Sequence, residues 1–463
     1  MTLEYQNSRQ FYRYVLLLAL PIMLQNGITN FVSLLDNIMV GRVGTEQMSG
    51  VAIVNQLMFV FNVTLFGATT GPGIFTSQFH GRGNEEGIRQ TLRFKLMACL
   101  VISLLAIGLF GFAGTALIQA WLHDDASGDL VLTLHSAQAY LKVMLLGMVP
   151  FAVKEAYSST LRETGRTAVP MRASLVAVAV NMTFNYILIF GKLGAPALGV
   201  VGAAIATVLS RFVECACLVF YVHRPKSGCG YAQGLYRSLH VDHYLIGDIF
   251  RKGLPLICNE ALWSTSITLL SRCYSERGLM VVAAYNITSA VTTVASVVYL
   301  ALGNASGIVM GATLGAGKTD EARKIAPRLC LFGAAFSAMV GLVEGLLSGV
   351  FPMVYNTTPE IRALAAHMIL AHSICQPFMA VANCEYFILR SGGNVLVTML
   401  FDSVYYCLIV VPLTAVLAFR TDLPILAIFM ISQAVQCLKC VMGAVFVHRG
   451  KWVRNLASQY DQA

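Results

Sequence analysis

The chain has 463 residues, of which 57% are hydrophobic and 12% are charged. Because a soluble domain carries about 25% charged residues, this composition excludes a soluble globular protein and predicts one that crosses a membrane many times. The net charge of +9 does not indicate nucleic-acid binding, since Lys and Arg gather in the short segments between apolar runs.

Apolar runs that are long enough to cross a bilayer of ~30 Å recur along the whole chain. The connections between them are short and leave no room for a soluble catalytic domain. The sequence therefore predicts an all-α polytopic membrane protein with twelve transmembrane helices. The runs cover residues 14–40, 48–76, 91–119, 132–161, 169–191, 197–223, 246–275, 279–311, 326–351, 361–389, 396–419 and 423–447.

The orientation follows from the basic residues, most of which fall in the connections on one side of the membrane. That bias predicts that both termini lie in the cytoplasm, with an even number of crossings. The first apolar run follows Arg9 and Arg13, but no small-residue cleavage site comes after it. We therefore expect an uncleaved first helix and not a signal peptide.

The first span, Leu16 to Gly44, carries its polar residues on one side. At ~100° per residue, the polar side chains from Gln25 to Asn37 share roughly 140° of arc. Such a helix faces lipid on one side and water or a ligand on the other. Asp36 lies on the polar arc, and a carboxylate within a membrane costs ~2.5 kcal/mol or more on insertion scales. We interpret Asp36 as a functional acid; the alternative is an interfacial carboxylate that caps the end of the helix.

The two halves of the chain align with each other, which predicts two six-helix bundles related by a parallel tandem repeat. The expected domains are an N-terminal bundle (residues 1–223), a cytoplasmic connecting segment (224–248) and a C-terminal bundle (249–463). The matched pairs are Pro21 with Pro255, Gly81 with Gly315 and Gly83 with Gly317 at a shift of 234 residues, and Leu161 with Leu389 and Arg162 with Arg390 at a shift of 228.

A second polar group lies on the first helix of the C-terminal half. Asn259 and Glu260 are followed by Trp263, three residues after the acid and therefore on the same helix face. A carboxylate beside an aromatic ring is suited to an organic cation.

Other ionisable residues fall within the spans. Arg211 and Glu214 are three residues apart, and we expect them to neutralise each other. Whether Glu260, Glu344, Glu385 or Asp402 takes part in ion coupling stays open at this point.

The 12 cysteines lie mostly within the spans and predict no disulfide framework. Cys437 and Cys440 form a CxxC pair that we interpret as packing residues. The chain carries neither an HExxH nor a GxSxG motif, so we expect neither an enzyme nor a bound cofactor.

Three stretches resemble the MATE family, the multidrug and toxic compound extrusion transporters. LLDNIMVGRVG at 34–44 is similar to the family's first-helix signature, and NMTFNYILIFGKLGAPALGVVG at 181–202 to its fifth and sixth helices. NEALWS at 259–264 is similar to the seventh helix of a bacterial branch. The resemblance covers nearly the whole chain. It implies a pair of bundles that open alternately to each side of the membrane and expel a substrate in exchange for H⁺ or Na⁺.

The resemblance also implies roles for particular residues. Asp36 occupies the position of the first-helix carboxylate that takes part in cation coupling, and Asn181 and Asn185 match the pair on the fifth helix that surrounds it. Some members carry Asp at the second of these positions, where this chain has Asn185. The amide oxygens suit a Na⁺ ion or a protonated Asp36; the alternative is two asparagines that bond between helices. The candidate substrate contacts are Asn30, Asn259, Glu260 and Trp263.

The predicted function is a cation-coupled antiporter that exports small organic, often cationic, compounds across a bacterial cytoplasmic (inner) membrane. A lipid or lipid-linked oligosaccharide flippase of the same superfamily is the nearest rival, and it calls for a basic cavity. An ion channel would need a selectivity filter, which the sequence does not show. The expected partners are the substrate and membrane lipids, with no nucleic acid, and the protein is expected to be a monomer. The sequence does not distinguish H⁺ from Na⁺ as the coupling ion.

Overall fold

The computed structural model describes residues 8–121 and 129–460, and every regular element in these ranges is helical. Twelve long helical segments follow one another along the described chain. The first six consist of α1 (Ser8–Gly41), α2 (Thr45–Arg82), α3 (Glu85–Trp121), the pair α4 (Leu130–Leu146) and α5 (Met148–Glu163), α6 (Ala168–Phe190) and α7 (Gly199–His223). The last six consist of α8 (His243–Ser275), α9 (Leu279–Gly315), α10 (Thr319–Leu346), α11 (Pro359–Ser391), the broken helix from α12 (Val395–Met399) to α13 (Val411–Arg420), and α14 (Ile425–His448).

Within the described residues, ten helices are long and apolar enough to cross a membrane, and the bent pair α4 and α5 makes an eleventh. The bend of 49° falls at Gly147, between the two helices. The remaining segment, α8, has 33 residues and is long enough to cross. It is less apolar because it carries the polar group Asn259 and Glu260. The all-α fold with twelve crossing helices is therefore confirmed.

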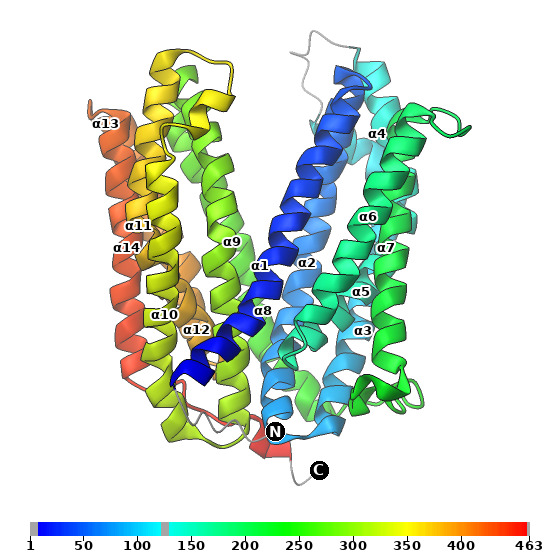
Figure 1. The fold of residues 1–463 in the computed structure, drawn as a ribbon, viewed down its shortest axis with the longest axis vertical. Coiled ribbons are helices and arrows are strands. Elements are labelled where there is room, and N and C mark those ends of the chain that lie inside the picture. The colour runs from blue at the N-terminus through cyan, green and yellow to red at the C-terminus, as the bar shows by residue number, and fades with distance from the viewer. Residues whose placement is uncertain (1–7, 122–128, 461–463) are drawn as a thin grey trace. The chain divides into compact units, whose positions relative to one another are not determined.

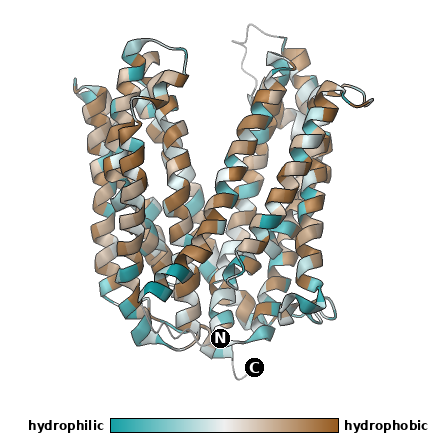
Figure 2. Ribbon diagram, in the orientation of Figure 1, coloured by the Kyte–Doolittle hydropathy of each residue, from teal (hydrophilic) through white to brown (hydrophobic). Residues whose placement is uncertain are grey.

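The outer helix faces are apolar, as a lipid environment requires. On α3, Val101, Leu104, Leu105 and Phe112 are exposed, Phe112 by 96%. Figure 2 shows hydrophobic residues along the middle of the helices and hydrophilic ones concentrated in the connections. A soluble monomer rarely exposes apolar patches of this extent, so the chain is a multi-pass membrane protein.

The described chain divides into two compact units. The N-unit holds Leu24–Thr76 and Glu85–Ile249, and the C-unit holds the described parts of Met1–Met23, Ser77–Asn84 and Phe250–Ala463. In the N-unit, α6 packs along α7, and α5 packs against α3 and α7. In the C-unit, α11 packs against α9, α10 and α14, and Figure 1 shows α10 and α11 side by side.

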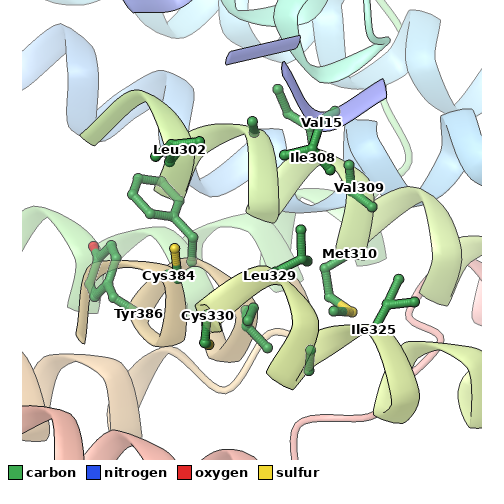
Figure 3. Close-up of a cluster of buried hydrophobic side chains, with 14 of the residues drawn as sticks. Val15, Leu302, Ile308, Val309, Met310, Ile325, Leu329, Cys330, Cys384 and Tyr386 are labelled. Carbon is green, nitrogen blue, oxygen red and sulfur yellow. The ribbon is translucent and has the colours of Figure 1, made fainter. Parts of the chain in front are cut away.

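This division differs from the expected domains at the beginning of the chain. Residues 8–23 group with the C-unit because Phe11, Val15 and Leu18 are buried in that unit's main core. Figure 3 shows part of this core, with Val15 at its edge beside Ile308. The labelled members are Val15 of α1, Leu302, Ile308, Val309 and Met310 of α9, Ile325, Leu329 and Cys330 of α10, and Cys384 and Tyr386 of α11.

The connecting segment also differs from the expectation, because 224–248 belongs to the N-unit. The Arg93 side chain of α3 is buried and donates to three carbonyl oxygens of this segment: Leu235 at 2.9 Å, Gly234 at 3.0 Å and His240 at 3.2 Å. The segment is thus a folded part of one unit and not a separate linker.

The helix from α12 to α13 is interrupted by π-helical turns. Residues Leu400–Val404 and Tyr406–Val410 form π-helical turns between α12 and α13. Such turns often occur at functional positions, and Asp402 lies in the first of them.

The connection from α2 to α3 and the one from α9 to α10 contain the same kind of turn. Gly83 and Gly317 in these connections both have a φ of 77°, a conformation that favours glycine. These two glycines are partners in the tandem repeat.

Candidate functional site

The N-unit brings together the three residues expected to bind the coupling ion. The Asn185 Nδ2 group donates to Asp36 Oδ1 at 2.5 Å and to Asn181 Oδ1 at 3.1 Å. Asn181 Nδ2 donates in turn to Thr207 Oγ1 of α7 at 3.4 Å. The spacing of four residues places both asparagines on the face of α6 that meets α1 and α7. Asp36 therefore bonds to a neighbouring helix and does not cap the end of its own.

Two features make this group suitable for a small cation. Asn181 and Asn185 are buried, Asp36 is half-buried, and Asn185 Oδ1 has no hydrogen-bond partner. In the part of the chain that the structure describes, neither Lys nor Arg forms a salt bridge with Asp36. A carboxylate and amide oxygens are hard donors that fit Na⁺, and the carboxylate alone can take a proton.

The same described residues contain no group of three or more His, Cys, Asp or Glu side chains that could hold a metal ion. A Na⁺ site at Asp36, Asn181 and Asn185 would have a single carboxylate and rely on amide oxygens. Asn30, a candidate substrate contact on α1, is exposed, two turns before Asp36.

A second polar cluster of the N-unit joins α1, α6, α7 and α5. Gln25 Nε2 donates to Ser174 Oγ at 2.9 Å, and Ser174 Oγ donates to Glu214 Oε1 at 2.5 Å. Glu214 forms a salt bridge with Lys154 of α5 at 3.7 Å and also interacts electrostatically with Arg211. The Arg211 guanidinium lies over the ring of Phe151, 4.8 Å from its centroid.

The C-unit contains a cluster built from α8, the π-helical turn and α14. Asn259 Nδ2 donates to Asp402 Oδ2 at 3.1 Å, and Lys439 Nζ forms an ion pair with Asp402 Oδ1. The Ser403 hydroxyl donates to the backbone oxygen of Asn259 at 2.7 Å, which fixes α8 against the π-helical turn. Asn259 is 2% exposed, and its Oδ1 atom is buried without a partner.

Glu260 lies next to this cluster and interacts electrostatically with Arg390 and Asp402. It is mostly buried, whereas Trp263, one turn further along α8, is 44% exposed. Asn259 and Glu260 are thus within one polar group. Their role in substrate binding stays a prediction.

Two further acids within the helices of the C-unit are buried. Glu344 Oε1 lies 3.1 Å from His372 Nδ1, and its Oε2 atom has no partner. Glu385 is 2% exposed, and its Oε2 atom, also unpartnered, lies against Gly443. A Cβ atom added to Gly443 would come within 2.0 Å of that oxygen.

The sequence alone did not assign Thr207, Lys154, His372 or Lys439 to these clusters. Lys439 carried a usable signal, since a lysine within an apolar span generally has a functional or ionic partner. The others are polar residues common in membrane helices, and their neighbours lie on helices distant in sequence. Their positions follow from the packing of the bundle and not from local spacing.

A family model described as MatE matches residues 21–187 and 255–416. Two relatives named probable multidrug resistance protein NorM are similar over most of the chain. The protein of Thermotoga maritima is 24% identical over 440 residues, which cover 95% of this chain and 92% of the relative. The protein of Bacillus subtilis (strain 168) is 26% identical over 415 residues, covering 88% and 89%.

Solved structures share the fold at lower identity. A multidrug resistance MATE family transporter of the MOP superfamily, in an outward-facing conformation, matches with a TM-score of 0.84 and 18% identity. A MATE in complex with MaL6 matches with a TM-score of 0.85 and 17% identity. Each match covers 95% of this chain and 96% of the other.

Proposed function

The chain belongs to the MatE family, and from that premise we propose that it is a multidrug efflux transporter that exchanges small organic compounds for a coupling cation. Family members are secondary transporters and not enzymes. The relatives named for multidrug resistance support this proposal over nearly the full length of the chain. We place the protein in a bacterial cytoplasmic membrane with both termini in the cytoplasm, as the bias of Lys and Arg favours.

The observation that carries the proposal is the arrangement at Asp36. Its carboxylate bonds to the amide of Asn185 and to no Lys or Arg among the described residues. An acid without a fixed counter-ion in a membrane protein must obtain its neutralising charge from elsewhere. A proton or a Na⁺ ion provides it, and either one can be released as the binding site opens to the other side of the membrane.

We assign substrate binding to the polar group of the C-unit, with Asn259, Glu260 and Trp263. Asn30 of α1 is a separate candidate substrate contact in the N-unit. Carboxylates next to aromatic rings favour organic cations, so the expected substrates are small and often cationic. The tandem repeat supports alternating access, in which one bundle rocks against the other. No cofactor is needed, because the ion gradient supplies the free energy.

A flippase for lipids or lipid-linked oligosaccharides is less well supported. Phosphate-bearing substrates call for unpaired basic side chains. In the C-unit cluster, Lys439 is paired with Asp402, and Arg390 lies near Glu260. The acids therefore already balance the bases in this group.

The test is transport of ethidium, a fluorescent organic cation, in proteoliposomes under separate pH and Na⁺ gradients. We expect Asp36→Asn to abolish gradient-driven transport while the protein stays folded. Asp422→Asn makes the same chemical change at an exposed residue between α13 and α14 and should leave transport unchanged. Wild-type transport by well-folded Asp36→Asn protein would refute the coupling role, and the response to each gradient identifies the ion.

A further inference from the structure

The two units contain similar polar clusters around residues that the repeat pairs, but the charged residues are placed differently. The repeat shift of 234 residues pairs Gln25 with Asn259, and the shift of 228 pairs Ser174 with Asp402. In both units the amide of the first helix donates to this residue of the fifth, at 2.9 Å for Ser174 and 3.1 Å for Asp402.

In both units, the oxygen atom of the same amide side chain has no hydrogen-bond partner. Gln25 Oε1 and Asn259 Oδ1 are both buried without a hydrogen-bond partner. A buried amide oxygen without a partner is costly in a low-dielectric interior. Its occurrence at two repeat-related positions points to a structural pattern and not to an isolated defect.

The charges of the two clusters are placed differently. In the N-unit, Glu214 of the sixth helix accepts from Ser174, and its counter-ion Lys154 comes from α5. In the C-unit, Lys439 of the sixth helix forms an ion pair with Asp402 of the π-helical turn. The shift of 228 residues pairs Lys439 with Arg211 of the N-unit. In the C-unit, the Lys439 ammonium group therefore lies beside the Asp402 carboxylate and the Asn259 amide. These oxygen donors are also the kind that would surround a bound cation.

The environment of Lys439 fits a cation-binding position. Both oxygens of Asp402 accept, one from Lys439 and one from Asn259, and the free Asn259 Oδ1 belongs to the same group. The side chains of Lys439 and Asp402 are 18% and 16% exposed, so the pair is not fully enclosed by the rest of the chain. The Lys439 ammonium also lies 5.8 Å from the centre of the Phe401 ring, within the range of a cation–π contact.

We propose that Lys439 is a tethered counter-ion, which holds the cation position at Asp402 until the cationic group of a transported compound displaces it. The proposal rests on the proposed function, and it names the chemistry of the substrate contact: an ammonium or similar organic cation held by Asp402 and by Asn259 Oδ1. It also separates the two carboxylates. Asp402 exchanges a lysine for a substrate, whereas Asp36 exchanges the coupling ion.

The test is equilibrium binding of ethidium to the purified full-length chain in detergent, measured by fluorescence at one pH. When a ligand must displace a resident group, its apparent affinity is its intrinsic affinity multiplied by the fraction of time for which the position is free. We expect Lys439→Met to bind ethidium about tenfold more tightly, if the position is free roughly one tenth of the time. Lys439→Arg keeps the charge and should stay near the wild type.

Two controls separate displacement from a general electrostatic effect. Lys142→Met removes an exposed lysine of α4 in the other unit and should leave ethidium affinity unchanged. In an Asp402→Asn background, Lys439→Met should give no gain, because the carboxylate that attracts ethidium is gone. The same gain with and without Asp402, or unchanged or weaker binding by Lys439→Met, would overturn the proposal.

Thermal unfolding in detergent tests the pair without any substrate. Each single variant, Lys439→Met or Asp402→Asn, leaves one charge without its partner and should lower the unfolding temperature. The double variant should recover much of that loss, and additive losses would show that the two side chains do not interact. If the wild type does not transport ethidium, the proposed function fails for this substrate. The unfolding temperatures of the single and double variants still show whether Lys439 and Asp402 interact. If neither the wild type nor Lys439→Met binds ethidium, displacement is refuted.

Discussion

The acids within the helices differ in what neutralises them. Asp402 is paired with Lys439 and Glu214 with Lys154, while Glu344 lies against His372. Asp36 accepts from an amide, which carries no charge. Because a carboxylate in a membrane needs a compensating charge or proton, the nature of the partner distinguishes a candidate coupling acid from one that is already satisfied.

This reasoning predicts a structural role for Glu344. It is 3% exposed and hydrogen-bonded to His372, which is 7% exposed. We expect Glu344→Ala to leave a buried polar group unpaired and to lower the free energy of unfolding by about 1–3 kcal/mol. Coupled efflux per folded molecule should be unchanged. Thermal unfolding and proteoliposome transport would be measured on the same preparation, and Asp36→Asn should show the reverse pattern. Loss of ion dependence in Glu344→Ala would mean that the acid takes part in coupling.

At this scale the sequence was informative where spacing within one helix decides the geometry. The interval of four residues placed Asn181 and Asn185 on one face, and the structure adds the bond from Asn185 to Asp36. Contacts such as Asn181 with Thr207 or Asp402 with Lys439 join different helices. They depend on how helices rotate and pack, which hydrophobic periodicity constrains only loosely.

At the scale of the helices, the glycines matched by the repeat turn out to be contact points. Gly81 near the end of α2 lies against the backbone oxygen of Ala312, and Gly315 at the end of α9 lies against that of Gln78. A Cβ atom at either glycine would come within 1.9 Å of that oxygen. The two helix ends thus approach closely through a reciprocal pair of glycines, both within the C-unit.

Replacing either glycine should separate the two helix ends. We expect Gly81→Ala and Gly315→Ala each to lower the free energy of unfolding by about 1–3 kcal/mol or more, since backbone atoms give way less easily than side chains. Gly108→Ala on α3 is the matched control, because a Cβ atom there meets nothing within 4 Å and alanine favours a helix. Thermal unfolding in detergent would measure all three. Equal stability of Gly81→Ala and Gly108→Ala would contradict the close approach.

The repeat itself was visible in the sequence because glycine and proline leave a recognisable pattern, whereas other helix details were not. The apolar runs predicted the twelve segments, but not the π-helical turns that hold Asp402. A π-helical turn needs an extra residue within one helical turn, and the run 396–419 gives no sign of it. The bend between α4 and α5 was also missed, although Gly147 lies at its centre.

At the scale of the whole molecule, the boundary between the units is not where the sequence placed it. Composition suggested a separate connecting segment at 224–248, because it is polar and rich in glycine. The structure assigns it to the N-unit, with Arg93 bound to Gly234, Leu235 and His240 and with Arg89 bound to the oxygen of Tyr231. Hydrogen bonds from an arginine of a remote helix to backbone carbonyls carry no sequence pattern that could have predicted them.

Arg93 should therefore determine how firmly this segment is held. Arg93→Ala removes charge-assisted bonds to three carbonyl oxygens, each worth about 1.5–3 kcal/mol, and the segment should open locally far more often. We expect trypsin to cleave after Arg237, which is exposed in this segment, at least about tenfold faster than in the wild type. Arg172→Ala, at an exposed arginine of α6, is the control and should leave the rate unchanged. The fragments would be followed by mass spectrometry under native conditions. If trypsin cleaves Arg93→Ala as slowly as the wild type, other contacts hold the segment. If trypsin cleaves both proteins rapidly, the segment is an independent linker.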